Sequence, residues 1–483
     1  MRPTQHGEPT HTKLVATLGP ASTPPGRLET LLEAGVDVCR LNFSHGALDE
    51  HAAALRRIRD WSATHERIVA VLGDLCGPKI RLNTVRDARF ELAEGDTVRF
   101  ERGDDDCTPQ RFTINYARFV DEVSVGHRVY IDDGLVRLIV TEKSDDGVTC
   151  SCTAGGSVSS HKGVNLPDTR LSAPALTEKD LRDLDWAIEH KLDYVALSFV
   201  RKPADLAKLR EIVDSRESDL GLIVKIEKVD ALEHLDTFVA RADGLMVARG
   251  DLGVEMDVWQ VPLIQKGIVA RCRDAGKPVI VATQMLQSMI EHPTPTRAEV
   301  SDVANAILEG ADAVMLSAET AAGKYPALAV EIIHNVAVAT EAFALRRTAT
   351  DASESIPTGE RRVSAVAEAA VRAARHLDAR LVAVWSASGE TVRLIARHRL
   401  PMPVVGITYD ERVERQLNLL YGVIPIRIPP LSNPIEMARR LDQRLLDANL
   451  ARDGDLIVVV TSSTPTVSGS TDTTLVHRIG QSE

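Results

Sequence analysis

The feature that most constrains the fold is a series of short apolar runs between residues 13 and 317. Most of these runs are followed by an amphipathic stretch whose apolar residues recur with the period of a helix. The runs are apolar throughout, as strands are when both faces of a parallel sheet are covered. We expect strands at 13–19, 37–43, 67–74, 193–200, 222–227, 244–250, 278–284 and 311–317, and helices at 24–34, 177–190, 203–216 and 260–275. Eight such units predict an α/β chain with a closed (β/α)8 TIM barrel. A doubly wound open sheet is the alternative, which the number of strands disfavours.

One long interruption separates the third and fourth of these strands. Residues 80–170 contain short alternating runs divided by glycine and aspartate turns, which is typical of a small β domain. Asp133-Gly134 and Asp146-Gly147 predict two hairpin turns. Because this β-barrel-like insert leaves the barrel at the carboxyl end of a strand, we expect it to cover that rim as a lid. The barrel then comprises residues 12–79 and 171–345.

The C-terminal part of the chain predicts a separate domain. A polar segment at 346–362 resembles a linker, and residues 363–483 alternate helices and strands again. We expect strands at 380–386, 403–408, 422–428 and 455–461, and helices at 363–378, 390–398, 410–418 and 434–449. This pattern predicts an α/β sandwich of its own.

Composition excludes several classes of function. The net charge of −12 argues against a nucleic-acid surface. No apolar run reaches the roughly 18 residues of a membrane span, and the N-terminus lacks a signal-peptide core. The six cysteines fit neither a disulfide framework nor zinc spacing. We therefore expect a cytoplasmic protein with no membrane and no nucleic-acid partner.

Two carboxylates are placed to bind a metal ion. Glu227 ends one expected strand and Asp251 follows the next, so both should lie at the carboxyl rim of the barrel. A rim site with two carboxylates suits Mg²⁺, which leaves its other positions to water or substrate oxygens. Lys225 lies two residues before Glu227, on the same face of the strand. A metal ion beside an ammonium is what charge stabilisation in phosphoryl transfer requires.

Other polar residues also fall at the ends of expected strands. Each is commonplace alone, since such residues are usually solvated, cap a helix or form structural ion pairs. Their shared position at the strand ends indicates an active site, because barrel enzymes place active sites at this rim. The set comprises Arg40, Asn42, Ser44 and His45 around the end of strand two, Asp74, Lys79 and Arg81 around the end of strand three, and Gly250 and Thr283 at the ends of strands six and seven.

Long motifs in the chain resemble the pyruvate kinase family. They include TLGPAS (17–22), RLNFSHG (40–46), DLCGPKIR (74–81), IDDG (131–134), KGVNLP (162–167), LTEKD (176–180), KIE (225–227), MVARGDLGVE (246–255), ATQMLQSM (282–289) and the run 295–320. The resemblance covers residues 12–335 with few gaps and continues more weakly to the C-terminus. It implies a barrel, an inserted lid and a C-terminal regulatory domain, with a homotetramer as the usual assembly.

The resemblance also implies the reaction and the roles of the site residues. The final step of glycolysis transfers the phosphoryl group of phosphoenolpyruvate to ADP, giving pyruvate and ATP. Glu227 and Asp251 would hold Mg²⁺ or Mn²⁺, and Lys225 would neutralise the phosphoryl oxygens in transit. Arg40 would bind the phosphate, while Thr283 and the backbone of Gly250 and Asp251 would receive the substrate carboxylate. The nucleotide would face Asn42, Phe43, Ser44, His45, Arg81 and Lys162.

One departure from the family concerns a monovalent cation. Family members usually hold K⁺ near the positions of Asn42, Ser44, Asp74 and the carbonyl of Leu75. Potassium-dependent members have an acidic residue where this chain has Lys79. Because an ammonium group carries the charge of K⁺, we expect Lys79 to replace the ion and activity not to require K⁺.

A loop in the C-terminal domain resembles the family's effector-phosphate loop. It contains Ser386, Ser388, Gly389 and Thr391, and residues 466–474 offer a second loop that could face it. Glu390 places a negative charge inside the loop, which disfavours a sugar bisphosphate. We expect an allosteric site for another phosphorylated metabolite or a nucleotide.

Two other classes of function are alternatives. A barrel lyase or aldolase could use the same carboxylate pair to stabilise an enolate, but it would not need a lid with Arg81 and Lys162. A catalytically inactive metabolite sensor would keep the C-terminal domain and lose a residue at the rim. All of Arg40, Lys225 and Thr283 are present, which favours the kinase.

Overall fold

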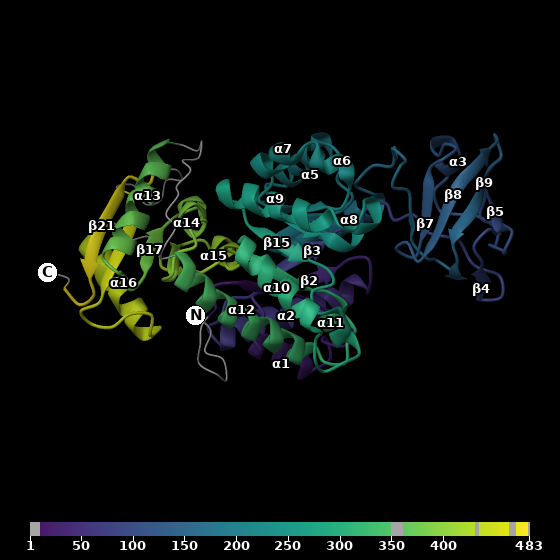
Figure 1. Cartoon of the computed structure of the whole chain (residues 1–483). Coiled ribbons are helices and arrows are strands. Elements are labelled where there is room, and N and C mark those ends of the chain that lie inside the picture. The colour runs from purple at the N-terminus through teal and green to yellow at the C-terminus, as the bar shows by residue number, and fades with distance from the viewer. Residues whose placement is uncertain (1–9, 349–360, 430–433, 463–469, 482–483) are drawn as a thin grey trace.

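In the computed structural model of the chain, the described residues are 10–348, 361–429, 434–462 and 470–481. Three parts lie in a row, with the barrel in the middle, the β-rich insert at one end and the C-terminal domain at the other (Figure 1). The insert and the C-terminal domain therefore lie at opposite ends of the barrel.

All eight strands expected for the barrel are present, and all but β13 are somewhat shorter than their apolar runs. They close in the order β1-β16-β15-β14-β13-β12-β3-β2, and every neighbouring pair is parallel. The closed barrel is confirmed, and the open-sheet alternative is wrong. The strands are β1 (Lys13–Thr17), β2 (Val38–Asn42), β3 (Ala70–Asp74), β12 (Tyr194–Leu197), β13 (Gly221–Ile226), β14 (Gly244–Ala248), β15 (Val279–Ala282) and β16 (Ala313–Leu316).

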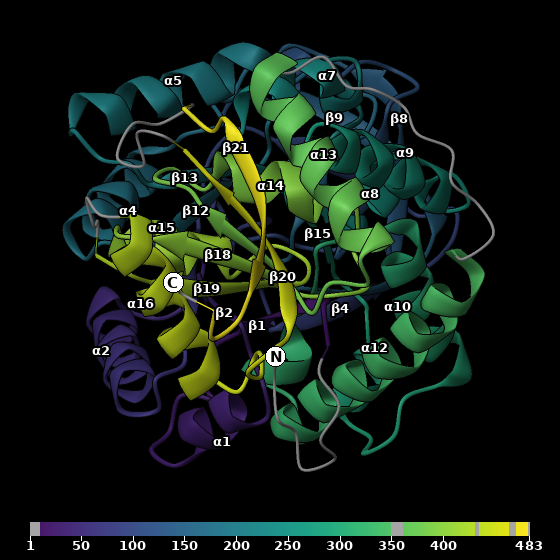
Figure 2. The same ribbon diagram turned by 90° about the vertical axis from the view of Figure 1, so that its left-hand side faces the viewer.

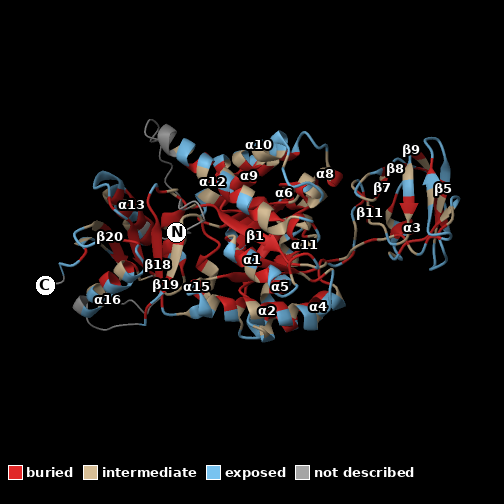
Figure 3. Cartoon of the chain, turned by 90° about the horizontal axis from the view of Figure 1, so that it is seen from below, coloured by how far each residue is buried: buried red, intermediate tan, exposed pale blue. Residues whose placement is uncertain are grey.

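Helices surround the barrel and bury its strands, which are nearly all buried along their whole length (Figure 3). The helices around the barrel are α1 (Arg27–Glu33), α2 (Leu48–Thr64), α4 (Glu178–Glu189), α5 (Pro203–Ser215), α7 (Leu235–Arg241), α9 (Val261–Asp274), α10 (Arg297–Glu309) and α12 (Pro326–Thr348). Short helices follow several strands at the rim: α6 (Val229–Leu232), α8 (Arg249–Glu255), η1 (Gln287–Ile290) and α11 (Ala318–Ala321). Within the described residues, the segment Pro326–Ala344 of α12 has the length and composition of a membrane span. It packs against α10 and α11 as a barrel helix.

The insert has a core of its own, which includes Phe100, Phe112 and Phe119. A six-stranded sheet in the order β11-β7-β8-β9-β5-β6 and a two-stranded sheet of β10 and β4 enclose it. Both expected hairpins occur, since β7 pairs antiparallel with β8 and β8 with β9. The elements are β4 (Arg89–Leu92), β5 (Thr97–Glu101), β6 (Arg111–Phe112), α3 (Phe119–Glu122), β7 (Arg128–Ile131), β8 (Val136–Lys143), β9 (Gly147–Ala154), β10 (Gly156–Ser159) and β11 (Val164–Asn165).

The C-terminal domain is a five-stranded sheet in the order β19-β18-β17-β20-β21, with helices packed on it. The four expected strands pair in parallel, and an unexpected edge strand, β21, pairs antiparallel with β20. Most of the expected linker, 349–360, lies outside the described residues. The elements are α13 (Arg361–His376), β17 (Val382–Trp385), α14 (Glu390–Ala396), β18 (Val404–Thr408), α15 (Glu411–Leu417), β19 (Val423–Arg427), α16 (Pro434–Asp447), β20 (Leu456–Thr461) and β21 (Thr473–Arg478).

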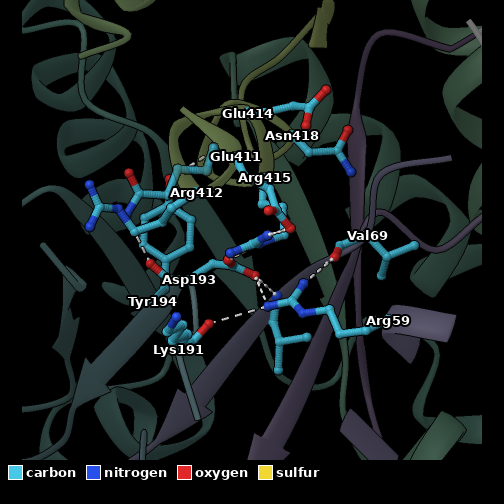
Figure 4. Close-up of polar contacts among 12 residues, drawn as sticks. Arg59, Val69, Lys191, Asp193, Tyr194, Glu411, Arg412, Glu414, Arg415 and Asn418 are labelled. Carbon is cyan, nitrogen blue, oxygen red and sulfur yellow. Dashed lines mark hydrogen bonds and ion pairs between the residues drawn. The ribbon is translucent and has the colours of Figure 1, made fainter. Parts of the chain in front are cut away.

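Helix α15 joins this domain to the end of the barrel opposite the lid (Figure 2). Asp193, fully buried just before β12, accepts hydrogen bonds from Arg59 of the barrel at 2.9 Å and from Arg415 of α15 at 2.6 Å (Figure 4). Leu419, just after α15, is buried among the side chains that fill the barrel interior. The C-terminal domain therefore closes the amino-terminal mouth of the barrel.

Candidate active site

Two carboxylates, one buried and one half-buried, lie side by side at the carboxyl rim of the barrel. Glu227 follows β13 and Asp251 lies in the first turn of α8 after β14, and β13 pairs directly with β14. The Glu227 carboxylate accepts a hydrogen bond from the Phe199 N–H at 2.7 Å. Burial raises the pKa of both carboxyl groups, and the charge of Asp251 raises the pKa of Glu227 further. Hard oxygen donors that repel each other in a buried cleft fit a divalent cation such as Mg²⁺.

Lys225 connects this carboxylate pair with a third acidic residue. Its ammonium group lies 2.7 Å from a Glu227 oxygen and 3.2 Å from an Asp74 oxygen, and it donates a hydrogen bond to the Ser198 hydroxyl at 2.7 Å. Burial alone would lower the pKa of Lys225, but the charges of Asp74 and Glu227 outweigh burial and raise it. The ammonium is therefore charged at neutral pH and fixed in place.

Arg40 approaches the same cluster from β2. Its Nε donates to an Asp74 oxygen at 2.6 Å, and one terminal nitrogen donates to the Thr17 hydroxyl at 2.9 Å. Burial would raise the pKa of Asp74, but Arg40 and Lys225 together hold it below its usual value. Asp74 thus fixes two cations that can bind an anion in the cleft.

Thr283 and Gly250 meet across β15 and α8. The Gly250 N–H donates to the Thr283 hydroxyl oxygen at 2.7 Å. Thr283 has a φ of 70° and Gln284 one of 55°. A positive φ is uncommon for any residue other than glycine, and it is most strained for the β-branched Thr283. Such strain is concentrated at functional sites, where the surrounding structure maintains it.

Lys79 contacts one of the residues expected to bind a monovalent cation. Its ammonium group donates to the Ser44 hydroxyl at 3.0 Å. The Asn42 side-chain oxygen accepts the Ser44 N–H at 3.2 Å, and the Leu75 carbonyl accepts the Ser198 hydroxyl at 2.8 Å. Asp74, as described above, is paired with Arg40 and Lys225.

A cleft of about 440 Å³ lies between the lid and the barrel. Arg81 and Lys162 line it from the lid side, while His45 and Asp251 line it from the barrel. Lys162 forms an ion pair with Asp132 at 2.7 Å, and Arg81 donates to the His161 carbonyl at 2.7 Å. The cleft is thus lined by cations of the lid, one of them paired with Asp132, and it reaches Asp251 of the carboxylate pair.

A second cavity of about 920 Å³ opens beside this cleft. Its walls contain Arg40, Lys225, Glu227 and Thr283 together with Asn42 and Ser44. Phe43 differs from the other residues expected to face the nucleotide. Its ring is buried at 2% exposure and packs edge-on against Trp186, so its side chain belongs to the barrel core.

Sequence reasoning missed three residues that hold this site in place. They are Thr17, Ser198 and Phe199, which bind Arg40, Lys225 and Glu227, respectively. All three lie at the carboxyl end of an expected barrel strand. Position alone does not single them out, because a hydroxyl or an aromatic residue at a strand end is commonplace.

The candidate effector loop lies at the start of α14. Gly389 has a φ of 76°, and the Thr391 and Thr471 hydroxyl oxygens lie 2.7 Å apart. This contact joins the loop that contains Ser386–Thr391 to residues 470–474, the described part of the second loop. Residues 466–469 of the second loop lie outside the described residues.

Comparison with known proteins agrees with this geometry. The family model for the pyruvate kinase barrel domain matches residues 9–330, and the model for the pyruvate kinase alpha/beta domain matches residues 364–477. The chain belongs to the pyruvate kinase family. The pyruvate kinase of Mycobacterium intracellulare is 43% identical over 471 residues, covering 98% of this chain and 99% of the relative. That of Corynebacterium glutamicum is 41% identical over 473 residues, covering 97% and 98%. That of Bacillus licheniformis is 39% identical over 472 residues, covering 97% and 80%.

Membership in the family establishes the broad activity. The chain is a phosphotransferase of glycolysis that acts on phosphoenolpyruvate and ADP and yields pyruvate and ATP. A divalent metal, generally Mg²⁺, is the family's cofactor. These findings favour the kinase over the lyase and sensor alternatives.

Proposed function

We propose that this pyruvate kinase transfers the phosphoryl group with the cluster around Lys225 and needs no K⁺. Phosphoenolpyruvate would lie in the larger cavity, with its phosphate against Arg40 and Lys225. Both cations are held by Asp74, so no side chain needs to reorganise when charge develops. A divalent ion held by Glu227 and Asp251 would add charge stabilisation to the same oxygens.

The substrate carboxylate would lie near Thr283 and the first turn of α8. The Gly250 N–H donates to the Thr283 hydroxyl oxygen, and a substrate carboxylate oxygen would replace that oxygen as the acceptor. The Thr283 hydroxyl donates to the Ala282 carbonyl at 2.6 Å and would donate to the substrate instead, then take part in passing a proton to the enolate carbon. The strained backbone at Thr283 supports a functional role.

The nucleotide would enter the cleft between lid and barrel. Arg81 and Lys162 would bind its phosphates after releasing the His161 carbonyl and Asp132. Asn42, Ser44 and His45 border the phosphate path from the barrel side. Phe43 would contribute only its backbone, because its ring is buried.

The contact between Lys79 and Ser44 carries the proposal of K⁺ independence. It places a positive charge beside Asn42 and Ser44, and burial together with that charge lowers the pKa of His45. A K⁺ ion at this position would repel the ammonium group. Lys79 would therefore supply the charge that a monovalent cation supplies elsewhere in the family.

The deciding experiment measures pyruvate formation from phosphoenolpyruvate and ADP with Mg²⁺, using Na⁺ or K⁺ as the only monovalent salt. We expect equal rates for the unmodified enzyme in both salts. Lys79→Glu should be slow in Na⁺ and regain activity in K⁺. Lys208→Glu, an exposed lysine on α5, is the matched charge reversal and should behave like the unmodified enzyme. Equal activation by K⁺ in the unmodified enzyme and Lys79→Glu would refute the role of Lys79.

We also propose allosteric control through Ser386–Thr391 and the loop that contains Thr471. The contact between the Thr391 and Thr471 hydroxyls supports it, because it brings two hydroxyl-rich loops together. Glu390 disfavours a sugar bisphosphate. A panel of sugar phosphates and nucleoside monophosphates, tested at subsaturating phosphoenolpyruvate, should contain an activator that Thr391→Val no longer responds to. Indifference to the whole panel would remove this proposal.

Finally, we propose a cytoplasmic homotetramer, as the family relationship suggests. The exposed side chains of Val258 and Trp259, between α8 and α9, and of Leu263, in the first turn of α9, lie close together in the chain at 68%, 71% and 70% exposure. Apolar residues clustered in this way commonly mark a contact surface. A second copy of the chain is the partner we propose for it.

A further inference from the structure

The lid is connected to the barrel by two chain segments, and one short loop of the barrel contacts both. This loop, residues 198–202, follows β12 and precedes α5. One segment leaves the barrel for the lid after β3 and contains Leu75 and Gly77. The Ser198 hydroxyl donates to the Leu75 carbonyl of this outgoing segment at 2.8 Å. The Phe199 ring lies against Gly77, where a Cβ atom would come within 2.6 Å of it. Gly77 has a φ of 65°, so this close approach requires glycine for two reasons.

The other segment returns from the lid to the barrel and contains Leu171 and Ala173. Arg201 binds two backbone carbonyls of this returning segment. Its two terminal nitrogens donate to the carbonyl oxygens of Leu171 and Ala173. Leu171 packs against the hydrophobic core of the lid. Ser172, between these two residues, is held by Glu122 of the lid through its N–H and its hydroxyl. Arg201 therefore binds the chain at the point where the lid ends and the barrel resumes.

The same loop is attached to the carboxylate pair. The Phe199 N–H donates to Glu227 at 2.7 Å, and Phe199 has a φ of 55°. Lys228, next to Glu227, places its ammonium 5.5 Å from the centre of the Phe199 ring and pairs with buried Glu255 at 2.5 Å. A continuous chain of contacts thus runs from Glu227 through Phe199 to Arg201 and the returning segment.

We propose that Arg201 is a positioning residue that sets the lid over the carboxylate pair and thereby the affinity for the nucleotide. The proposal rests on the proposed function in one respect, namely that Arg81 and Lys162 bind nucleotide phosphates. A guanidinium group presents two donors in a fixed geometry that a lysine cannot reproduce. Because the phosphoenolpyruvate site is built from the barrel rim alone, Arg201 acts on ADP binding and not on phosphoenolpyruvate binding.

The test compares Arg201→Gln and Arg201→Lys with Arg210→Gln. Arg210, on α5, pairs with Asp243 at 2.6 Å on the outer side of the barrel. Arg210→Gln is therefore the control, because it removes an arginine contact that does not involve the lid. The loss of two charge-assisted hydrogen bonds should raise the KM for ADP by roughly tenfold or more in Arg201→Gln. The KM for phosphoenolpyruvate should change by less than about twofold, since its contacts remain. Arg201→Lys should give an intermediate KM for ADP, and Arg210→Gln should resemble the unmodified enzyme.

A second measurement does not depend on activity. Hydrogen exchange of the amides in residues 171–175 and 77–82, without ligands, should be faster in Arg201→Gln and unchanged in Arg210→Gln. Unchanged exchange in Arg201→Gln, or equal increases in both KM values, would overturn the proposal. If the unmodified enzyme formed no ADP-dependent pyruvate, the proposed function would fail, while hydrogen exchange would still decide whether Arg201 holds the lid. If Arg201→Gln does not fold, Arg201→Lys provides both measurements.

Discussion

Around Lys225, four charged side chains (Arg40, Asp74, Lys225 and Glu227) each have a partner of opposite sign. Asp74 pairs with Arg40 and Lys225, and Lys225 also pairs with Glu227. These side chains are at most 11% exposed, so little water screens them. Fixed charges in a low-dielectric site stabilise a transition state without reorganising when the reaction occurs.

Substituting Lys225 tests this at the level of one residue. Lys225→Met keeps an unbranched side chain, one atom shorter, and removes the charge. We expect kcat to fall by about 10²–10³-fold or more, because the group acts on charge that develops in transit. Steady-state kinetics at saturating substrates measure this, with Lys208→Met as the control on an exposed lysine. A fall of less than about tenfold in a folded variant would show that Lys225 is dispensable.

The sequence revealed the charged residues of this cluster but not the polar residues that hold them. Lys225 and Glu227 stand out because two charges alternate along an apolar strand. Ser198 and Thr17 carry no such signal, since a single hydroxyl at a strand end is commonplace. Their partners depend on how β12 pairs with β13 and how β1 pairs with β2, and pairing is a property of the closed barrel.

At the scale of elements, helix α15 shows how a short segment can join two domains. The Asp193 carboxylate is fully buried and accepts hydrogen bonds from the Val71 N–H at 2.7 Å and from Arg59 and Arg415. Gln416, next to Arg415, donates to the Asp193 carbonyl at 3.0 Å. The helix is therefore attached to the start of two barrel strands, β3 and β12.

Two arginines of α15 should differ sharply in their effect on stability. Arg415→Ala removes one partner of a buried carboxylate and should lower the free energy of unfolding by roughly 3 kcal/mol. Arg412→Ala is the control on the same helix, because its partner Asp219 is 74% exposed. That loss should cost about 1 kcal/mol or less. Chemical denaturation of both variants measures the difference, and equal effects would contradict the role given to Asp193.

Strands buried on both sides could be predicted, and the exposed one could not. The apolar runs located every strand of the barrel because burial on both faces requires them. Strand β21, Thr473–Arg478, is largely exposed at the edge of its sheet and contains few apolar residues. Only its pairing with β20 makes it a strand.

At the scale of the whole molecule, the order of the domains and the position of the lid could be predicted from the sequence, but the placement of the C-terminal domain could not. The interruption after the third strand predicted a lid near the carboxyl rim. That the C-terminal domain closes the opposite mouth depends on contacts such as Arg415 with Asp193, and on Leu419 in the barrel interior. Single charged or apolar residues far apart in the chain do not reveal such contacts in one sequence.

The proposed assembly can be tested on the exposed apolar cluster of Val258, Trp259 and Leu263. Burial of one large aromatic side chain in an interface contributes up to several kcal/mol, and a carboxylate in its place would be buried without a partner. We therefore expect light scattering after size-exclusion chromatography to give a tetramer for the unmodified protein and a smaller species for Trp259→Glu. Leu135→Glu, at 71% exposure in the lid, is the matched control and should remain tetrameric. A tetramer in Trp259→Glu would place the interface elsewhere, because a buried tryptophan could not accept that charge without dissociation.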